Sequence, residues 1–219
     1  MDRGHVVWDW NGTLLDDLPI VVESVNRSIA LLGEAPITDD EYRDHYTRPV
    51  RLFYQSMFGR ELSDREWSRL NEAFHEHYFL LAADAGLRPG AREAMQKVTD
   101  CGFGQSLLSM SPQSWLAQIV ERLEIEPHFQ LVTGLSGPTG GLKAPHLVAH
   151  LRRLRLKGSV VVMIGDTPDD VVAARHVGAR PVLFHGGSHH LHVLEALDAP
   201  IAETLVEAAE IACSDVSRR

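Results

Sequence analysis

Five short apolar runs, separated by segments with helical periodicity, constrain the fold of this chain more than any other feature. Their β-branched residues favour buried strands that pair in parallel; the runs span residues 6–8, 106–108, 130–132, 160–164 and 181–184. Helical periodicity occupies residues 91–98, 113–123, 145–154 and 169–177. Because strands that alternate with helices form a parallel sheet between two helical layers, we predict a doubly wound α/β sheet.

One long stretch, from about Pro19 to Leu87, breaks this alternation because its pattern is helical throughout. Helices are predicted at residues 20–32, 39–46, 52–58 and 65–81. Thr38 and Ser63 each precede a Glu by three residues, the spacing of a capping box at a helix start. We therefore expect a core domain of residues 1–16 and 88–219 and an inserted all-helical domain of residues 17–87.

The charge balance and the cysteines limit the partners and the setting of the protein. With 21 Lys and Arg against 30 Asp and Glu, the net charge is −9, which disfavours nucleic acid and anionic membranes as partners. Cys101 and Cys213 lie far apart in the sequence, so neither a disulfide framework nor a four-thiolate zinc site is expected. Without a signal-peptide pattern or a spanning apolar run, we expect a cytoplasmic protein, either monomer or homodimer.

Polar residues follow the predicted strands at the edge of the sheet where ligands bind in open α/β folds. The segments concerned are Asp9-Trp10-Asn11-Gly12-Thr13-Leu14 after the first run, Ser109 after the second, Lys143 after a Gly-rich turn, and Gly165-Asp166-Thr167-Pro168-Asp169-Asp170 after the fourth. The sequence therefore predicts that carboxylates, a hydroxyl and an ammonium group converge at this edge.

These residue types suit phosphoryl transfer. Asp9 and Asp166 would repel each other unless a cation lay between them, and hard oxygen ligands favour Mg²⁺. Lys143 and Ser109 could then hold an oxyanion whose remaining charge the metal neutralises. Asp9 is the candidate nucleophile.

Together, these four motifs resemble those of the haloacid-dehalogenase-like (HAD) superfamily of phosphohydrolases, in its phosphoglycolate-phosphatase-like branch. The resemblance covers nearly the whole chain, and the helical insertion lies where that family carries a cap. It implies a Rossmann-like core with an all-helical cap. It also implies a Mg²⁺-dependent phosphatase that acts on a small phosphorylated metabolite.

The resemblance further implies a role for each matching residue. Asp9 would attack phosphorus and form an aspartyl-phosphate, while Ser109 and Lys143 would bind the phosphoryl oxygens. Backbone amides would complete the phosphate cradle; they belong to Trp10, Asn11 and Met110. Mg²⁺ would be held by Asp9, Asp166 and the backbone carbonyl of Asn11, and Asp170 would orient the metal shell.

One position departs from the family pattern. Family phosphatases usually carry a second Asp two residues after the nucleophile, and it protonates the leaving oxygen; here the residue is Asn11. An amide cannot shuttle a proton near neutral pH, and general acid–base catalysis is typically worth ~10²–10⁴-fold. Three explanations stay open: the enzyme is slow, another group such as a cap histidine or a bound water supplies the proton, or the leaving group is acidic enough to need none.

Several further residues carry expectations about the cap and the entrance to the site. Arg48 and Arg51 could grip a carboxylate or second phosphate of the substrate, and Trp10 is expected to line the entrance between cap and sheet. Cap-core positions are also predicted; they are Phe53, Tyr54, Phe58 and Trp67.

In the core domain, Ser111 is expected to cap the helix that starts after Pro112, which leaves Ser109 free. We expect Asp169 to stabilise the start of its helix and do no more. The His189-His190-x-His192 run is interpreted as partly solvated polar residues. The glycines of residues 137–141 are expected to form a hairpin that aims Lys143.

Two alternatives to a phosphatase belong to other functional classes. One is a dehalogenase or phosphonate-cleaving relative on the same fold, which is disfavoured because halide displacement needs no metal-binding acid such as Asp166. The other is a binding protein that accepts a phosphoryl group on Asp9 without turning over; a helical insertion is not needed for that role.

Overall fold

A six-stranded parallel sheet forms the centre of the computed structural model, which describes residues 4–137 and 141–214. The strand order is β3-β2-β1-β4-β5-β6, and every neighbouring pair is parallel. The strands are β1 (His5–Trp8), β2 (Gly104–Pro112), β3 (Val132–Leu135), β4 (Val161–Gly165), β5 (Arg180–Phe184) and β6 (Ile201–Ala202). This order places the first strand in the middle, as in doubly wound folds.

Helices cover both faces of the sheet, because successive strand residues point to opposite sides. Val6, Trp8 and Ile164 pack with α5 (Ala91–Asp100), α6 (Gln113–Arg122) and α10 (Leu205–Ser214) on one face. Val7 and Met163 pack with α7 (Ala144–Leu154) and α8 (Pro168–His176) on the other. The predicted doubly wound α/β sheet is confirmed. Short helices complete this domain; they are η2 (Glu126–His128), η3 (Gly158–Val160) and α9 (Leu191–Glu195).

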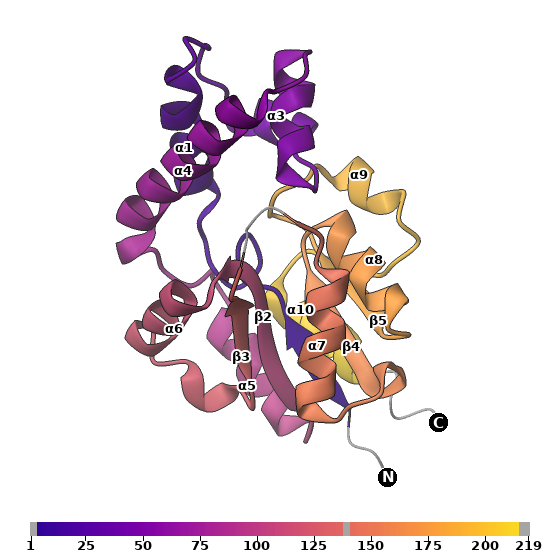
Figure 1. Ribbon diagram of the computed structural model, residues 1–219. Helices are drawn as coiled ribbons and strands as arrows, with labels where there is room; N and C mark the ends of the chain where they lie inside the picture. The colour runs from indigo at the N-terminus through magenta and orange to yellow at the C-terminus, as the bar shows by residue number, and fades with distance from the viewer. Residues whose placement is uncertain (1–3, 138–140, 215–219) are drawn as a thin grey trace.

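The inserted stretch forms a helical group with its own apolar core, which lies above the carboxyl edge of the sheet in Figure 1. Its elements are α1 (Leu18–Ala30), α2 (Asp39–His45), α3 (Val50–Phe58), α4 (Asp64–Leu81) and η1 (Ala82–Asp84). The capping boxes at Thr38 and Ser63 are both present. The four aromatic residues expected in this core pack there.

Two adjacent backbone segments connect the helical group to the sheet. Leu15 and Leu87 form an isolated bridge, the Asp16 amide donates to the Gly86 carbonyl over 3.0 Å, and the Arg88 amide donates to the Leu14 carbonyl over 2.9 Å. Because the chain leaves and returns at this one place, we retain the division into residues 1–16 with 88–219 and residues 17–87 as a proposal.

Some elements differ from the sequence prediction. β3 begins at Val132, two residues later than the predicted run, while β6 and α10 had not been predicted. β6 has two residues, too few to show a period. The packing of α10 on α5 places Cys213 beside Cys101, and the two form no disulfide. Across the part of the chain described, no helix has the length and apolarity that a membrane crossing requires.

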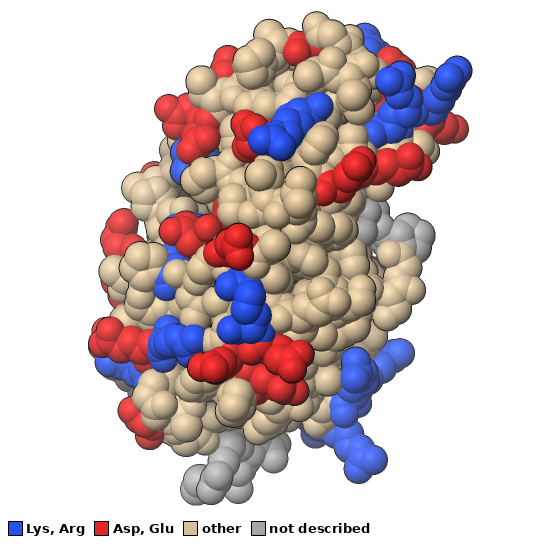
Figure 2. All heavy atoms as spheres, turned by 90° about the vertical axis from the view of Figure 1, so that its left-hand side faces the viewer, with Lys and Arg blue, Asp and Glu red and all other residues tan. Residues whose placement is uncertain are grey.

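Surface charges of both signs are mixed. On the face of the molecule drawn in Figure 2, most basic side chains lie beside acidic ones. The expectation that the chain does not bind nucleic acid stays a prediction.

Candidate active site

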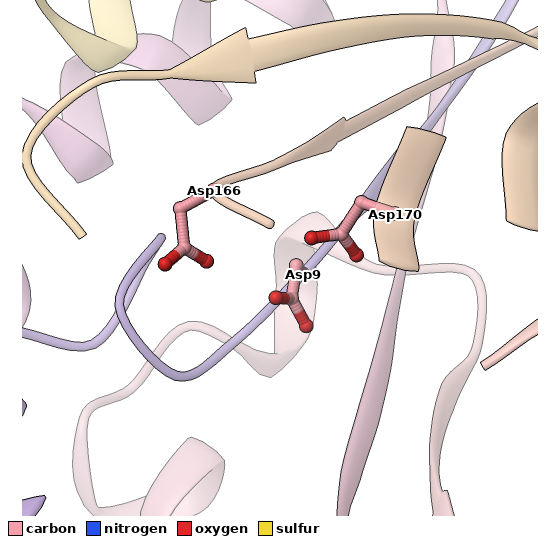
Figure 3. A group of neighbouring side chains, drawn as sticks. All are labelled: Asp9, Asp166 and Asp170. Atoms are coloured by element: carbon pink, nitrogen blue, oxygen red, sulfur yellow. The ribbon is translucent and has the colours of Figure 1, made fainter. Parts of the chain in front are cut away.

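Three buried carboxylates meet at the carboxyl edge of the sheet. Asp9 follows β1, Asp166 follows β4, and Asp170 lies in the first turn of α8. A carboxylate oxygen of each lies within 4.8 Å of the others, and Figure 3 shows the three side chains pointing toward a common space. Each carboxylate is therefore held where the other two repel its negative charge.

Lys143 supplies a cation to this cluster from the residue that precedes α7. Its Nζ lies 2.6 Å from Asp9 Oδ1 and also donates to Asp170 Oδ1. Burial alone would lower the pKa of Lys143, but Asp170 and Asp9 outweigh it and raise that pKa. Lys143 is therefore charged, and one ammonium faces three carboxylates.

The remaining negative charge disfavours the ionised form of Asp9. Burial, followed by repulsion from Asp170, raises the pKa of Asp9 to about 8, although Lys143 acts in the opposite direction. When all three carboxylates are ionised, they and the ammonium sum to −2, so a divalent cation would complete the charge balance and favour this state. Oxygen ligands of this kind suit Mg²⁺.

Asp166 is oriented by its neighbours. Thr13 Oγ1 donates to one of its oxygens over 3.0 Å, and the Ser188 amide donates to the other over 2.7 Å. A Cβ atom at Gly12 or Gly187 would come within 2.5 Å or 2.1 Å of Asp166 Oδ2, so only glycine allows the backbone this close. Such outer contacts fix the direction of a metal-binding carboxylate.

Asp170 and Asp169 both contact other residues of the site, although only Asp170 is predicted to take part in it. Asp170 Oδ2 accepts hydrogen bonds from the Thr167 amide (3.0 Å) and hydroxyl (2.7 Å), which forms a third capping box and leaves Oδ1 facing Lys143. Asp169 does more than stabilise its helix, because its Oδ2 accepts the Lys143 amide at 2.9 Å and lies 3.9 Å from Arg48 Nε.

Asn11 lies in a hydrogen-bond network that the sequence does not predict. Its Nδ2 donates to Asp17 Oδ2 over 2.7 Å and contacts the Tyr78 hydroxyl at 2.6 Å, while its Oδ1 accepts from Ser111 Oγ over 2.9 Å. Tyr78 also donates to Asp17 Oδ2, and the Gly12 amide donates to Asp17 Oδ1. Burial raises the pKa of Asp17 despite these bonds. The network ties the loop after β1 to α4 of the helical group.

Ser109 and Ser111 lie within β2, near its carboxyl end, rather than after the strand. Ser111 does not cap α6, because its hydroxyl bonds Asn11 and no side chain caps that helix. Ser109 is fully buried, and its Oγ accepts the Ser111 amide at 3.0 Å. Ser109 does not cap α6, as predicted, although its oxygen accepts this hydrogen bond. Met110, between them, lines the cavity described next.

A cavity of about 1080 Å³, measured out to its open mouth, lies between the carboxylates and the helical group. Asp9, Asn11, Met110, Lys143 and Arg48 are among the residues that line it. Asp9 and Lys143, both predicted as site residues, therefore border this cavity.

Two predicted substrate contacts lie elsewhere. Arg51 does not line the cavity; it pairs with Asp64 at 2.8 Å and donates to the Leu62 carbonyl, which ties α3 to the start of α4. Trp10 has no exposed surface and packs in the main core, so the prediction that it lines the entrance is wrong.

Two further predictions concern the histidines of residues 189–192 and the Gly-rich turn before Lys143. His189 is buried, not partly solvated, and burial lowers its pKa to about 4. His190 pairs with Asp44 at 3.2 Å. The expected hairpin includes residues 138–140, which lie outside the described residues.

Thermal stability with and without Mg²⁺ should reveal the charge imbalance. Because the pKa of Asp9 is raised to about 8 in the folded chain, the stability that protonated Asp9 contributes is complete below pH ~4 and lost as the pH rises through ~8. Bound Mg²⁺ offsets the negative charge that Asp9 gains on deprotonation. The stabilisation of the folded protein by Mg²⁺ should therefore grow over this pH range. We expect the Tm difference between Mg²⁺ and EDTA samples to be larger at pH ~8 than at pH ~5.

The difference between paired samples is the quantity to measure, because buried histidines such as His150, whose pKa is lowered to about 4, change the stability in the opposite direction. Asp166→Asn should shrink the Mg²⁺ effect. A Tm gain from Mg²⁺ that depends on neither the pH nor Asp166 would contradict Mg²⁺ binding at the three carboxylates.

Comparison with known proteins bears on what this arrangement does. A family model for haloacid dehalogenase-like hydrolases matches residues 4–178. The chain is 25% identical to a phosphoglycolate phosphatase of Vibrio parahaemolyticus over 221 residues, 94% of each chain, and 25% identical to one of Mesorhizobium japonicum over 227 residues, 95% of this chain and 99% of that protein.

Solved structures share the fold. A predicted phosphoglycolate phosphatase from Haemophilus somnus superposes with a TM-score of 0.79 at 16% identity, covering 96% of this chain and 98% of that one. CbbY from Rhodobacter sphaeroides, solved in complex with phosphate, superposes with a TM-score of 0.73 at 16% identity, covering 94% and 96%.

Proposed function

The chain belongs to the haloacid dehalogenase-like hydrolase family and is a phosphatase similar to the phosphoglycolate phosphatases, and on this premise we propose how it acts. It is a Mg²⁺-dependent enzyme that removes the phosphoryl group from a small phosphorylated metabolite through an aspartyl-phosphate at Asp9. The observation that carries the proposal is the contact of Asp9 with Lys143 inside a cluster of three buried carboxylates that opens into a cavity.

The reaction proceeds in two displacements at phosphorus. A carboxylate oxygen of Asp9 attacks, the bond to the leaving oxygen breaks, and that oxygen keeps the electron pair. Water then attacks the phosphorus of the aspartyl-phosphate, which releases phosphate and restores the carboxylate. Lys143, 2.6 Å from Asp9 Oδ1, orients the nucleophile and offsets the charge of the phosphoryl oxygens.

Asp9, Asp166 and Asp170 would hold Mg²⁺ together with the backbone carbonyl of Asn11. When bound, the ion neutralises the excess charge of the carboxylates and of the phosphoryl group. Thr13 and Ser188 keep Asp166 in position for this role.

Further phosphate contacts belong to the same proposal. Ser109 accepts one hydrogen bond and still has its own hydroxyl proton to donate to a phosphoryl oxygen. The backbone amides of Trp10, Asn11 and Met110 would add donors of the kind that bind anions elsewhere. Of the two arginines predicted to contact the substrate, Arg48 lines the cavity and is kept in the proposal.

Phosphate release from a panel of sugar, glycolate, nucleotide and acyl phosphates tests the proposal. We expect release with Mg²⁺, loss of activity in EDTA and recovery when Mg²⁺ is restored. Halide release from haloacids that EDTA does not affect would favour the dehalogenase. Lasting phosphorylation by acetyl phosphate without turnover would favour the phospho-accepting protein.

Replacing Asn11 by Asp should accelerate the hydrolysis of alkyl phosphates. The change supplies a proton donor for the leaving oxygen, and such groups contribute ~10²–10⁴-fold. The measurement is kcat for several alkyl phosphates, with Asn26→Asp in α1 as a control that makes the same chemical change outside the cavity lining. Unchanged or lower rates on these esters would show that a missing acid does not limit turnover.

A further inference from the structure

The walls of the cavity on the side of the helical group are largely aromatic. Its rings form an aromatic wall, which we define as Tyr42, Tyr46, Phe53, Phe74, Tyr78 and Phe79. Phe74 stacks on Tyr78 with ring centroids 5.6 Å apart, and Tyr42 stacks on Tyr46 at 5.0 Å. The rings support one another and are therefore held in place. Val21 and Val25 of α1 add an aliphatic surface to the same space.

The cations among the described cavity residues already have partners. Lys143 bonds Asp9 and Asp170. Arg48 Nη1 donates to the Gly141 carbonyl over 3.2 Å, and its Nε lies 3.9 Å from Asp169. A second anionic group on the substrate would compete with Asp169 and the Gly141 carbonyl for Arg48.

The other titratable groups that face the cavity add no positive charge. Burial raises the pKa of Tyr42 and Tyr78 well above the ordinary value, so their phenols are neutral. Burial also lowers the pKa of His75, which favours its neutral form. Beyond the phosphate position, the cavity is therefore suited to an uncharged, apolar group.

Asn11 adds an independent constraint on the leaving group. Its amide is held at both ends, by Asp17 and Tyr78 on Nδ2 and by Ser111 on Oδ1. At this position it gives no proton to the leaving oxygen, so the reaction favours an oxygen that departs readily as an anion. A phenol, whose pKa is about 10, leaves as phenolate far more easily than an alkyl alcohol leaves as alkoxide.

From these two observations we infer that the substrate is a phosphate monoester of an apolar phenol, with its ring against the aromatic wall. The inference rests on the proposed phosphatase activity and specifies its substrate class. The Asp9 oxygen bonds to phosphorus as the bond from phosphorus to the phenolic oxygen breaks. The phenolate keeps the electron pair and takes a proton from water after release, and water then hydrolyses the aspartyl-phosphate.

Three esters separate the inference from the proposed function. Phenyl phosphate should exceed phosphoglycolate in kcat/KM by about 100-fold, because burial of a ring and an acidic leaving group each contribute about tenfold or more. Benzyl phosphate keeps the ring but leaves as an alkoxide, so its kcat should be at least about tenfold below that of phenyl phosphate. The inference would be overturned if phosphoglycolate were hydrolysed as well as phenyl phosphate, or if benzyl phosphate were hydrolysed as fast. Either result would still be consistent with the proposed phosphatase activity. Release from none of the three, and from none of the wider panel, would instead contradict the proposed function.

A binding measurement isolates the aromatic wall from the chemistry. Phenylphosphonate, which is not hydrolysed, should inhibit at least about tenfold more tightly than methylphosphonate. Phe74→Ala should remove most of that preference, whereas Phe58→Ala, the same change in the helical group but outside the cavity lining, should retain it. Phe79→Ala provides a second test if Phe74→Ala unfolds. Equal inhibition by both phosphonates, or an equal effect of the variants at 74 and 58, would overturn the inference.

Discussion

Asp9→Asn should lower the rate of phosphate release by roughly 10⁴-fold or more. The amide is not nucleophilic, and loss of the attacking group in other covalent catalysts has effects of this size. The protein should remain folded, because the change removes one of three mutually repelling buried carboxylates. The measurement is kcat for phenyl phosphate together with a thermal melt.

Asp16→Asn is the matched control for this variant. It makes the same change seven positions later, at an exposed carboxylate that pairs with Arg88 at 3.2 Å. Its activity should stay near that of the wild type. Substantial turnover by Asp9→Asn would remove Asp9 from the role of nucleophile.

Lys143→Met should affect both activity and stability. Without the ammonium group, Asp9 and Asp170 lose the cation that each contacts. Removing one partner of a buried ion pair typically costs about 3–5 kcal/mol of unfolding free energy. We also expect kcat to fall by ~10²–10³-fold, the effect of losing one preorganised electrostatic contact in an active site.

Lys97→Met is the control, because Lys97 contacts Glu210 at the protein surface. Solvent screens surface ion pairs, which contribute little to stability, so this variant should keep its activity and nearly all its stability. If Lys143→Met were as active and as stable as Lys97→Met, the proposed role of Lys143 would be wrong.

The sequence predicts the sheet well because its strands are strongly apolar and its helices carry clear periodicity. β1 and β4 begin within one residue of their predicted starts, and the capping boxes mark the starts of α2 and α4. β6 escapes prediction because its pairing with β5 depends on tertiary contacts rather than on a local pattern.

The sequence predicts the site residues that follow strand ends. It predicts less well the contacts between residues that lie far apart in the sequence. Asp9 and Asp166 follow β1 and β4 directly, so the topology brings them together. Asp17 and Tyr78 are separated by 61 positions, and nothing local to either residue predicts their hydrogen bond. The burial of Asp17 distinguishes it, and burial is a property of the fold.

The network around Asn11 also bears on the second chemical step. Since Asn11 cannot accept a proton from the attacking water, we expect hydrolysis of the aspartyl-phosphate to be slow relative to its formation. The covalent intermediate should then accumulate during turnover of a phenyl ester.

Rapid acid quenching with radiolabelled phenyl phosphate tests whether Asp9 is the nucleophile. We expect protein-bound label approaching one phosphoryl group per chain, released by hydroxylamine as an acyl phosphate is. The label should be on the peptide that contains Asp9 and missing from Asp9→Asn. Phosphate release without any bound label, or label on another residue, would contradict this role of Asp9.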